Sequence, residues 1–304
     1  MELNRNVRNL AKRISAVPRT FKDGQLHKKN SHFPAGHYYS PIVSVDEIKK
    51  RADEIWKNEN VDGIVGIELK REDQLALVKN FEKFYAEIPF AENKSNGHRY
   101  YFENQFYSYT DAIMLYSMIR HFKPKQIIEV GSGFSSAVML DTNELFFDNS
   151  IRLTFIEPYT SRLNTLLTDK DRKNTTIIET DVQVVPFEVF EQLNAGDILF
   201  IDSTHVAKTG SDVNFILFEI LPRLKAGVLI HFHDIFYPFE YPKDWVYKGR
   251  NWNEDYFLRA FLMYNQAFEI KLFSNYLHML HPAAFEQMPL CYKNFGANLW
   301  LERK

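Results

Sequence analysis

Apolar residues recur with two different periods along the chain, and the two periods alternate from about residue 108 to the C-terminus. Short runs of Ile, Leu, Val and Phe predict buried strands, and the longer stretches between them place apolar residues at helical spacing. The expected strands cover residues 126–130, 152–157, 175–180, 197–202, 226–234, 268–274 and 297–303. The expected helices cover residues 108–122, the segment ending at Leu140, and residues 159–168, 186–193, 212–224 and 253–265.

The order of these elements predicts the fold class. The first five strands are separated by helices, which is typical of parallel βαβ units with helices on both faces of the sheet. The last two strands have no helical pattern between them and should pair antiparallel. We therefore expect an α/β fold with a doubly wound, mostly parallel sheet of seven strands and a C-terminal antiparallel strand.

The first hundred residues lack this rhythm. We predict that residues 1–107 form an N-terminal helical and irregular extension that serves as a substrate cap, with helices at 44–59 and 71–86. Residues 108–304 then form the domain that contains the sheet.

The N-terminal 30 residues are basic, with eight Lys or Arg against Glu2 and Asp23. Apolar residues at helical spacing between Val7 and Ile14 leave two interpretations open. The segment is a membrane-surface or targeting helix, or it is a solvated first helix with one face on the domain. The second is favoured because such a short pattern is common by chance.

Composition narrows the class of protein. A net charge of −2 over 304 residues argues against a polycation that binds nucleic acid. The single cysteine, Cys291, rules out a disulfide within the chain and indicates a reducing compartment. No apolar run reaches the roughly 18 residues of a membrane span. These features predict a cytoplasmic protein without stable membrane insertion.

Acidic residues follow all five of the expected parallel strands. In doubly wound sheets, ligands bind at the carboxyl ends of the strands, where the strand order reverses. We therefore expect these strand ends to form one site. They are Glu129–Gly133, Glu157, Thr180–Asp181, Asp202–His205 and His233–Asp234.

The segment "EVGSGFSS" (129–136) follows the first strand. Gly131 and Gly133 permit a tight turn and a close approach of ligand to backbone, and the helix that follows favours a negative group at its start. Glu129 suits an ammonium or sulfonium cation better than a pyrophosphate. Ser136 stands where the dinucleotide fingerprint has its third glycine, which disfavours the alternative of an NAD-dependent oxidoreductase.

Two further acids outline the rest of a ligand. A carboxylate at Glu157 can accept both hydroxyls of a ribose, and Asp181 can meet the exocyclic amine of an adenine. With the glycine segment, they indicate an adenosine attached to a cation.

The chain resembles the class I S-adenosylmethionine-dependent methyltransferases over about residues 108–303, and within them the bacterial group that includes macrocin-type sugar O-methyltransferases. The resemblance rests, in order and spacing, on "IIEVGSGFSSAVML", "LTFIEPYTSRL", "IIETDV", "DILFIDSTHVAKTGSDV" and "LPRLKAGVLIHFHD". It implies S-adenosylmethionine as cofactor, with the methionine part, the ribose and the adenine held by residues of these motifs. The implied cofactor-binding residues are Glu129, Gly131, Ser132, Gly133, Glu157, Asp181 and Asp202.

The same resemblance implies a catalytic centre at the ends of the fourth and fifth strands. His205 is the implied base, with Asp202 as its catalytic partner. Asp202, Asp234 and, as a third ligand, His233 are the implied ligands of Mg²⁺ or another divalent metal. The family more often has an acid where His233 stands.

We therefore expect a metal-assisted O-methyltransferase whose acceptor is a hydroxyl on a sugar, a glycan precursor or another small molecule. Metal-independent methylation of another small-molecule acceptor is an alternative, and a homo-oligomer is compatible with the sequence. A non-haem iron oxygenase using His231, His233 and Asp234 is disfavoured because side chains alternate along a strand. A binding protein that lost turnover is disfavoured by the acids at every strand end.

Several residues have competing interpretations. His231 is more typical of a core histidine, and His205 could serve only as a cap or hydrogen-bond partner. Surface placement is favoured over substrate contact for the N-terminal histidines, His27, His32 and His37. The aromatic loop 236–256 either forms a platform for a sugar ring or packs as a lid on its own domain.

Overall fold

The computed structural model describes residues 24–26, 28–94 and 97–304. The chain divides into two compact units, one of residues up to Ile55 with Lys243–Asn251, the other of Trp56–Pro242 with Trp252–Lys304. Residues 56–107 thus belong to the unit that contains the sheet, and the substrate cap expected over residues 1–107 stays a prediction. The helix expected near the basic N-terminus and His27 lie outside the described residues.

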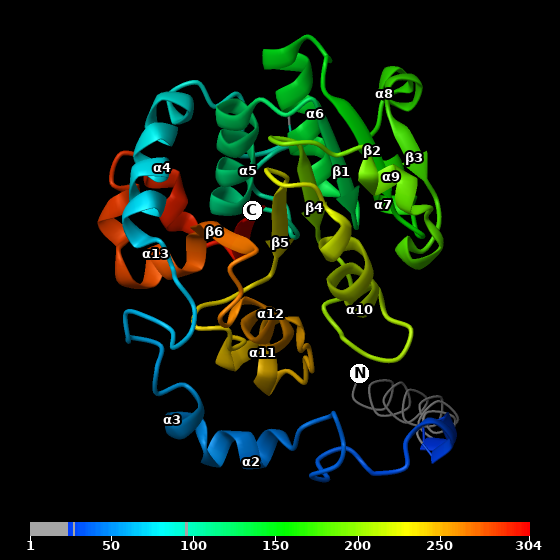
Figure 1. The fold of residues 1–304 in the computed structure, drawn as a ribbon, viewed down its shortest axis with the longest axis vertical. Coiled ribbons are helices and arrows are strands. Elements are labelled where there is room, and N and C mark those ends of the chain that lie inside the picture. Colours follow the sequence, from blue (N-terminus) through cyan, green and yellow to red (C-terminus); the bar gives the residue numbers. More distant parts are fainter. Residues whose placement is uncertain (1–23, 27, 95–96) are drawn as a thin grey trace, which may run out of the picture. The chain divides into compact units, whose positions relative to one another are not determined.

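The larger unit is built on a seven-stranded sheet of order β3-β2-β1-β4-β5-β7-β6 (Figure 1). Its strands are β1 (Gln126–Val130), β2 (Arg152–Ile156), β3 (Thr176–Ile178), β4 (Ile198–Ile201), β5 (Leu229–His233), β6 (Phe268–Phe273) and β7 (Asn298–Arg303). Strands β1 to β5 are parallel, and β7 lies antiparallel between β5 and β6. The predicted doubly wound sheet with a C-terminal antiparallel strand is confirmed.

The strand order reverses at β1, whose two neighbours are β2 and β4. In register, Val130 pairs with Ile156 of β2 on one side and with Ile201 of β4 on the other. The residues that follow these three strands therefore emerge at the same edge, which is where an open α/β sheet binds its ligand.

Helices surround the sheet in the larger unit. They are α4 (Arg71–Tyr85), α5 (Tyr109–Phe122), α6 (Phe134–Phe147), α7 (Ser161–Asn164), α8 (Asp169–Asn174), α9 (Phe187–Glu191), α10 (Asp212–Phe215), α12 (Glu254–Leu262) and α13 (Ser274–Leu280). The smaller unit contains α2 (Val45–Lys50), α3 (Ala52–Ile55) and α11 (Lys243–Tyr247). Helix α10 continues as a π-helical turn at Ile216–Ile220 and a 3-10 turn at Leu221–Arg223.

Two helical predictions were wrong. The single helix expected over residues 159–168 is replaced by α7 and α8, because Thr168 caps a new helix by accepting the amide of Asp171 while Asp171 accepts the amide of Thr168. Helix α13 lies between β6 and β7, where no helical pattern was expected. Its first five residues, Ser274–His278, are all buried, so it has no alternation of apolar and polar faces to recognise.

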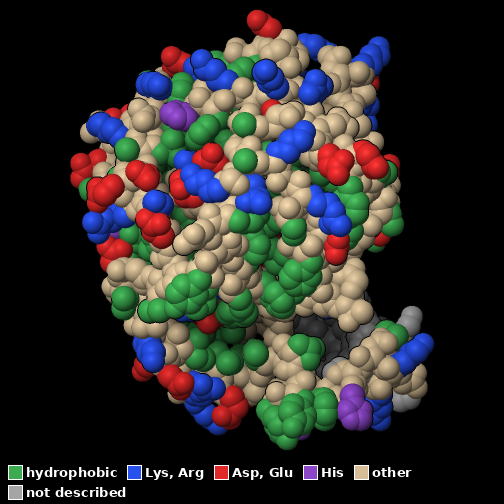
Figure 2. Space-filling model, viewed as in Figure 1, with side chains coloured by type: hydrophobic (Ala, Val, Ile, Leu, Met, Phe, Trp, Pro, Cys, Tyr) green, Lys and Arg blue, Asp and Glu red, His purple; other side chains and the backbone are tan. Residues whose placement is uncertain are grey.

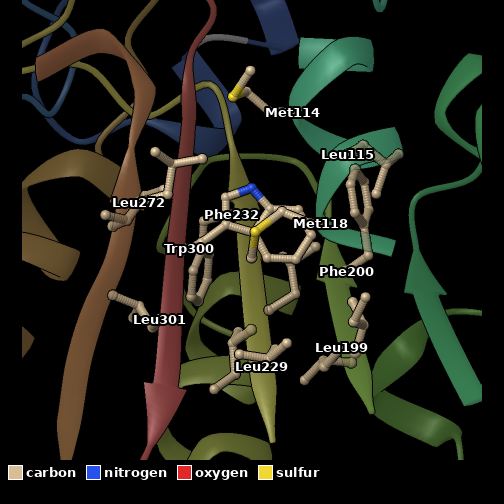
Figure 3. Close-up of a cluster of buried hydrophobic side chains, with 14 of the residues drawn as sticks. Met114, Leu115, Met118, Leu199, Phe200, Leu229, Phe232, Leu272, Trp300 and Leu301 are labelled. Atoms are coloured by element: carbon tan, nitrogen blue, oxygen red, sulfur yellow. The ribbon is translucent and has the colours of Figure 1, made fainter. Parts of the chain in front are cut away.

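The core lies where α5 packs on the sheet. Helix α5 buries Tyr109–Ile119 without interruption, and Figure 3 shows its Met114 and Met118 beside side chains of the central strands. Phe232 of β5 and Trp300 of β7 belong to the same cluster and are fully buried. The core therefore holds rigid the strands whose carboxyl ends carry the acidic residues.

Charges of both signs are interspersed over the visible face of the larger unit (Figure 2). Among the described residues, no helix is both long enough and apolar enough to cross a membrane.

Candidate active site

A cavity opens at the carboxyl ends of β1, β2 and β4. One part has a volume of about 820 Å³ and is lined by the glycine loop after β1 and by α7. A second part, of about 310 Å³, extends toward β3 and includes Asp181. The two parts share Gly131, Glu157, Tyr159, Asp202 and Ser203, so they form one continuous site at the point where the strand order reverses.

Gly131 allows the loop after β1 to pass tightly against β4. Its φ is +85°, and a Cβ atom built there would lie 1.7 Å from the backbone oxygen of Asp202. Its amide donates to the backbone oxygen of Ile156. Because only glycine fits this position, the loop can lie directly against the backbone that follows β4. A ligand bound on the loop therefore lies beside the ends of β1, β2 and β4.

Glu129 is fully buried behind this loop. Its carboxylate accepts the hydroxyl of Ser135 at 2.5 Å and the hydroxyl of Ser136, which tie β1 to the first turn of α6. Burial raises the pKa of Glu129 to about 8, although the serine hydroxyls act in the opposite direction. The geometry assigns Glu129 to holding the loop, and its expected contact with the methionine part stays a prediction.

Glu157, after β2, has two backbone partners in the site. Its Oε2 accepts the amide of Ser132 at 3.1 Å, and its Oε1 accepts the amide of Tyr159 at 2.8 Å. Asp181 lies farther along the same cavity and is exposed. The structure thus brings Glu157, Asp181 and Asp202 to one cavity, as the sequence predicted.

His205 lies deep at the end of β4 with carboxylates on both sides of its ring. Its Nδ1 atom donates to Oε2 of Glu254 over 2.9 Å, and its Nε2 atom lies 3.4 Å from Asp202 and 3.8 Å from Asp234. Burial alone would lower the pKa of His205, but the contacts with Asp202 and Glu254 outweigh it and raise the pKa to about 10. The ring of Trp252 lies 4.3 Å from the imidazole, between centroids.

His233, at the end of β5, is also enclosed by acids. Its Nδ1 atom lies 3.4 Å from Asp202 and 3.6 Å from Asp234, and its Nε2 atom lies 3.9 Å from Asp111 of α5. Burial lowers the pKa of His233, but Asp234 and Asp202 raise it well above its ordinary value. Asp111 is itself fixed by the amides of Ala297 at 2.8 Å and Asn298 at 2.9 Å.

Residues 128–235 match the family model of a methyltransferase domain. That range includes the glycine loop, Glu157, Asp181, Asp202, His205 and Asp234. An uncharacterized protein of Archaeoglobus fulgidus is 32% identical over 166 residues, which cover 53% of this chain and 73% of that protein. The chain therefore contains a methyltransferase domain.

Solved methyltransferase structures are similar in outline. The SAH-bound methyltransferase PaMTH1 of Podospora anserina is 16% identical, with 90% of this chain and 99% of that chain covered and a TM-score of 0.41. The Mg-SAM form of CmcI is 19% identical, with 73% and 84% covered and a TM-score of 0.39. At these values the likeness does not identify the reaction or the acceptor of this methyltransferase.

The ligand trio predicted for a divalent ion does not fit one as the methyltransferase is folded. Within the parts of the chain that the structure describes, no group of three or more His, Cys, Asp or Glu is arranged to hold an ion. Both ring nitrogens of His233 face carboxylates, and a histidine must be neutral to ligate a metal. The two strand-tip acids, Asp202 and Asp234, have imidazole rings as their close partners.

Sequence reasoning missed Glu254 and Asp111 in this methyltransferase. Glu254 begins α12, twenty residues after Asp234, and Asp111 lies in α5 before the first strand. Neither belongs to a strand end, so the search along strand ends could not find them.

Other predictions can be compared with the structure directly. His231 is fully buried and stacks on Phe200 with ring centroids 3.9 Å apart, so its interpretation as a core histidine is confirmed.

In the aromatic loop, Tyr237, Phe239 and Tyr241 are buried, which fits the packed lid rather than an open platform at these positions.

Proposed function

We propose that this methyltransferase transfers the methyl group of S-adenosylmethionine to a hydroxyl oxygen of a small molecule such as a sugar or a glycan precursor. The observation that carries the proposal is the triad of Asp202, His205 and Glu254 at the tip of β4. Asp202 also lines the donor cavity, so the Nε2 edge of His205 is adjacent to the donor. A hydroxyl is a poor nucleophile at neutral pH and needs such a base.

The reaction needs one proton acceptor and one leaving group. His205 Nε2 takes the hydroxyl proton, the acceptor oxygen forms the new bond to the methyl carbon, and the S–CH₃ bond breaks. Its electron pair stays on sulfur, which becomes the neutral thioether of S-adenosylhomocysteine. Because a thioether leaves without protonation, the chain supplies no general acid, and alignment of donor and acceptor supplies much of the rate.

The charge of the donor helps to prepare the base. In the donor-free protein, the raised pKa of His205 keeps the ring protonated at neutral pH. A bound sulfonium near Asp202 weakens the stabilisation that this carboxylate gives the imidazolium, so donor binding lowers the pKa of His205. Glu254 holds Nδ1 protonated, which leaves Nε2 as the basic atom.

Metal assistance is not part of this proposal. Asp202, Asp234 and His233 were predicted to bind Mg²⁺ or another divalent ion, and that site stays a prediction that the present donor geometry does not support. The cytoplasmic location and a homo-oligomeric state also stay predictions.

The test uses the full chain with radiolabelled S-adenosylmethionine and three probes, glucose, UDP-glucose and catechol, with mass spectrometry of the products. We expect a methyl ether on at least one probe. His205→Gln should lower turnover by about 100-fold or more while the Kd for S-adenosylhomocysteine stays within about twofold. His121→Gln, at a half-buried histidine of α5, is the matched control. Methylation only at nitrogen or carbon, or full turnover by His205→Gln, would overturn the proposal.

A further inference from the structure

Arg162 of α7 lies over the start of α6, at the wall of the donor cavity. A Cβ atom built on Gly133 would lie 3.3 Å from Cδ and 3.7 Å from Nη1 of Arg162, so the side chain crosses the glycine loop in close contact. Figure 1 shows α6 following β1, with α7 in the connection after β2. The position of the guanidinium is therefore fixed by the segments that follow β1 and β2, which are neighbours in the sheet.

An aromatic ring holds this guanidinium. Its carbon lies 3.8 Å from the centroid of the Phe106 ring, and Phe106 stacks on Phe134 with centroids 5.9 Å apart. Stacking uses the face of the guanidinium and leaves its N–H edge available for a planar anion. Phe106, Phe134 and Arg162 all line the cavity.

Arg162 has no acidic partner in the described part of the chain. No carboxylate there lies within 4.0 Å of its guanidinium, whereas Arg99, whose side chain is 8% exposed, contacts Asp141, Glu144 and Asp171. An arginine that is fixed in place and lacks a counter-ion in a ligand cavity favours an anionic group of the ligand.

The start of α6 lies at the same part of the cavity. Helix α6 has 14 residues, and the N–H groups of its first turn lack intrahelical acceptors and favour an anion. Ser132, which lines the cavity, is buried, with 5% of its surface exposed, and its hydroxyl is turned to Glu129 behind the loop, where it lowers the pKa of that carboxyl. The guanidinium of Arg162 and the first turn of α6 thus lie at the same part of the cavity.

We propose that Arg162 binds the carboxylate of the donor's amino-acid part and thereby makes the enzyme specific for an intact methionine moiety. Glu157, the expected ribose ligand, accepts the amide of Ser132, so the ribose position and this anion site are separated only by the loop. A donor whose ribose lies on Glu157 would therefore have its amino-acid part within reach of Arg162 along that loop. This inference rests on the proposed function, since it assigns a residue to the same donor site.

The test measures the Kd values of the full chain for S-adenosylmethionine and for decarboxylated S-adenosylmethionine, which keeps the sulfonium and the ammonium. Arg162→Gln should weaken binding of the intact donor by about tenfold or more and leave the decarboxylated donor within about twofold. Arg162→Lys should recover part of the loss. Arg172→Gln removes the same charge from α8, at a residue that does not line the cavity, and should change neither Kd.

Each outcome has one reading. Equal losses for both donors would assign Arg162 a purely structural role and overturn the inference. Unchanged Kd values for both donors, with or without a raised KM for an acceptor, would also overturn it while leaving the methyltransferase proposal intact. Failure of the wild-type chain to bind either donor would overturn both.

Discussion

The Nδ1 atom of His205 lies 2.9 Å from the Oε2 atom of Glu254, and both side chains are buried. The backbone reinforces this contact, because the carbonyl of His205 accepts the amides of Asn253 and Glu254 at the start of α12. His205 itself has a φ of +60°, which is unusual for a residue with a side chain. Helix α12 is therefore tied to the residue proposed as the base.

Glu254→Gln should move the pH dependence of methyl transfer. The acids facing His205 are Glu254, Asp202 and Asp234, and the contacts with Asp202 and Glu254 raise its pKa to about 10 before the donor binds. The reaction needs the neutral ring, so the rate should rise with pH as His205 loses its proton. Removing the charge of Glu254 lowers that pKa, and the rising limb should shift to lower pH by about one unit or more.

The plateau rate of Glu254→Gln should also fall, by about tenfold, because the base is weaker and less well oriented. Glu240→Gln is the control, since Glu240 pairs with Tyr256 in the same unit and not with His205. A lower rate with an unmoved pH limb would mean that Glu254 only supports the fold.

Asp181→Asn should change the preference of the protein for adenine as the nucleobase of the donor. Asp181 lines the part of the cavity that extends toward β3, where its carboxylate would accept the amino group of adenine. We expect S-adenosylhomocysteine to bind about tenfold better than S-inosylhomocysteine in the wild type, and the asparagine variant to lose most of that difference. Calorimetry of both ligands with both proteins checks this, and Asp169→Asn, at an exposed acid of α8, should keep the wild-type preference.

The arrangement of the strand ends could be predicted because it follows from local pattern. Apolar runs such as the one ending at Val130 mark buried strands, and parallel strands must end at the same edge. The sequence therefore predicts Glu157, Asp181 and Asp202 in one site, and all three line one cavity.

The partners of the two histidines could not be predicted in this way. Asp111 reaches His233 from α5, and Glu254 reaches His205 from α12, across sequence separations that local pattern does not encode. The raised pKa values of both histidines depend on these long-range contacts and on burial. The metal site predicted on Asp202 and Asp234, with His233 as a third ligand, stays a prediction, and the acids around His233 are the part of its surroundings that local pattern could not show.

Glu129→Gln should remove part of the pH dependence of stability. The pKa of Glu129 is about 8 in the folded protein, above its ordinary value of 4.5, so the folded state holds this proton more tightly than the unfolded chain. The corresponding stability is complete below pH 4.5 and is lost as the pH rises through 8. At pH 9 the variant should be more stable than the wild type by on the order of 2–4 kcal/mol, with little difference at pH 4.

Urea unfolding of both proteins at pH 4 and pH 9 provides the measurement. His205 and the other groups titrate in both proteins, so the difference between their free energies of unfolding at each pH isolates the effect of Glu129. Glu188→Gln, at an exposed residue of α9, should leave the free energy of unfolding within about 0.5 kcal/mol at both pH values. A glutamine variant that is less stable at pH 9 would show that the ionised form of Glu129 is the one that the fold requires.

His233→Glu should build a divalent-metal site of three carboxylates at the ends of β4 and β5. The substitution would add a third carboxylate beside Asp202 and Asp234, which lie 3.4 and 3.6 Å from Nδ1 of His233, and three carboxylates are a donor set that suits Mg²⁺. Without an ion, the new charge would also face Asp111, so the variant should be less stable than the wild type in EDTA. Mg²⁺ at about one hundred times its Kd should then raise the Tm of the variant by roughly 5 °C or more.

The Tm of the wild type and of His233→Gln should not respond to Mg²⁺, and methyl transfer by the wild type should survive EDTA. Heat of Mg²⁺ binding to the wild type that disappears in Asp202→Asn would instead establish the metal site that the sequence predicted, with His233 displaced from its acidic partners on binding.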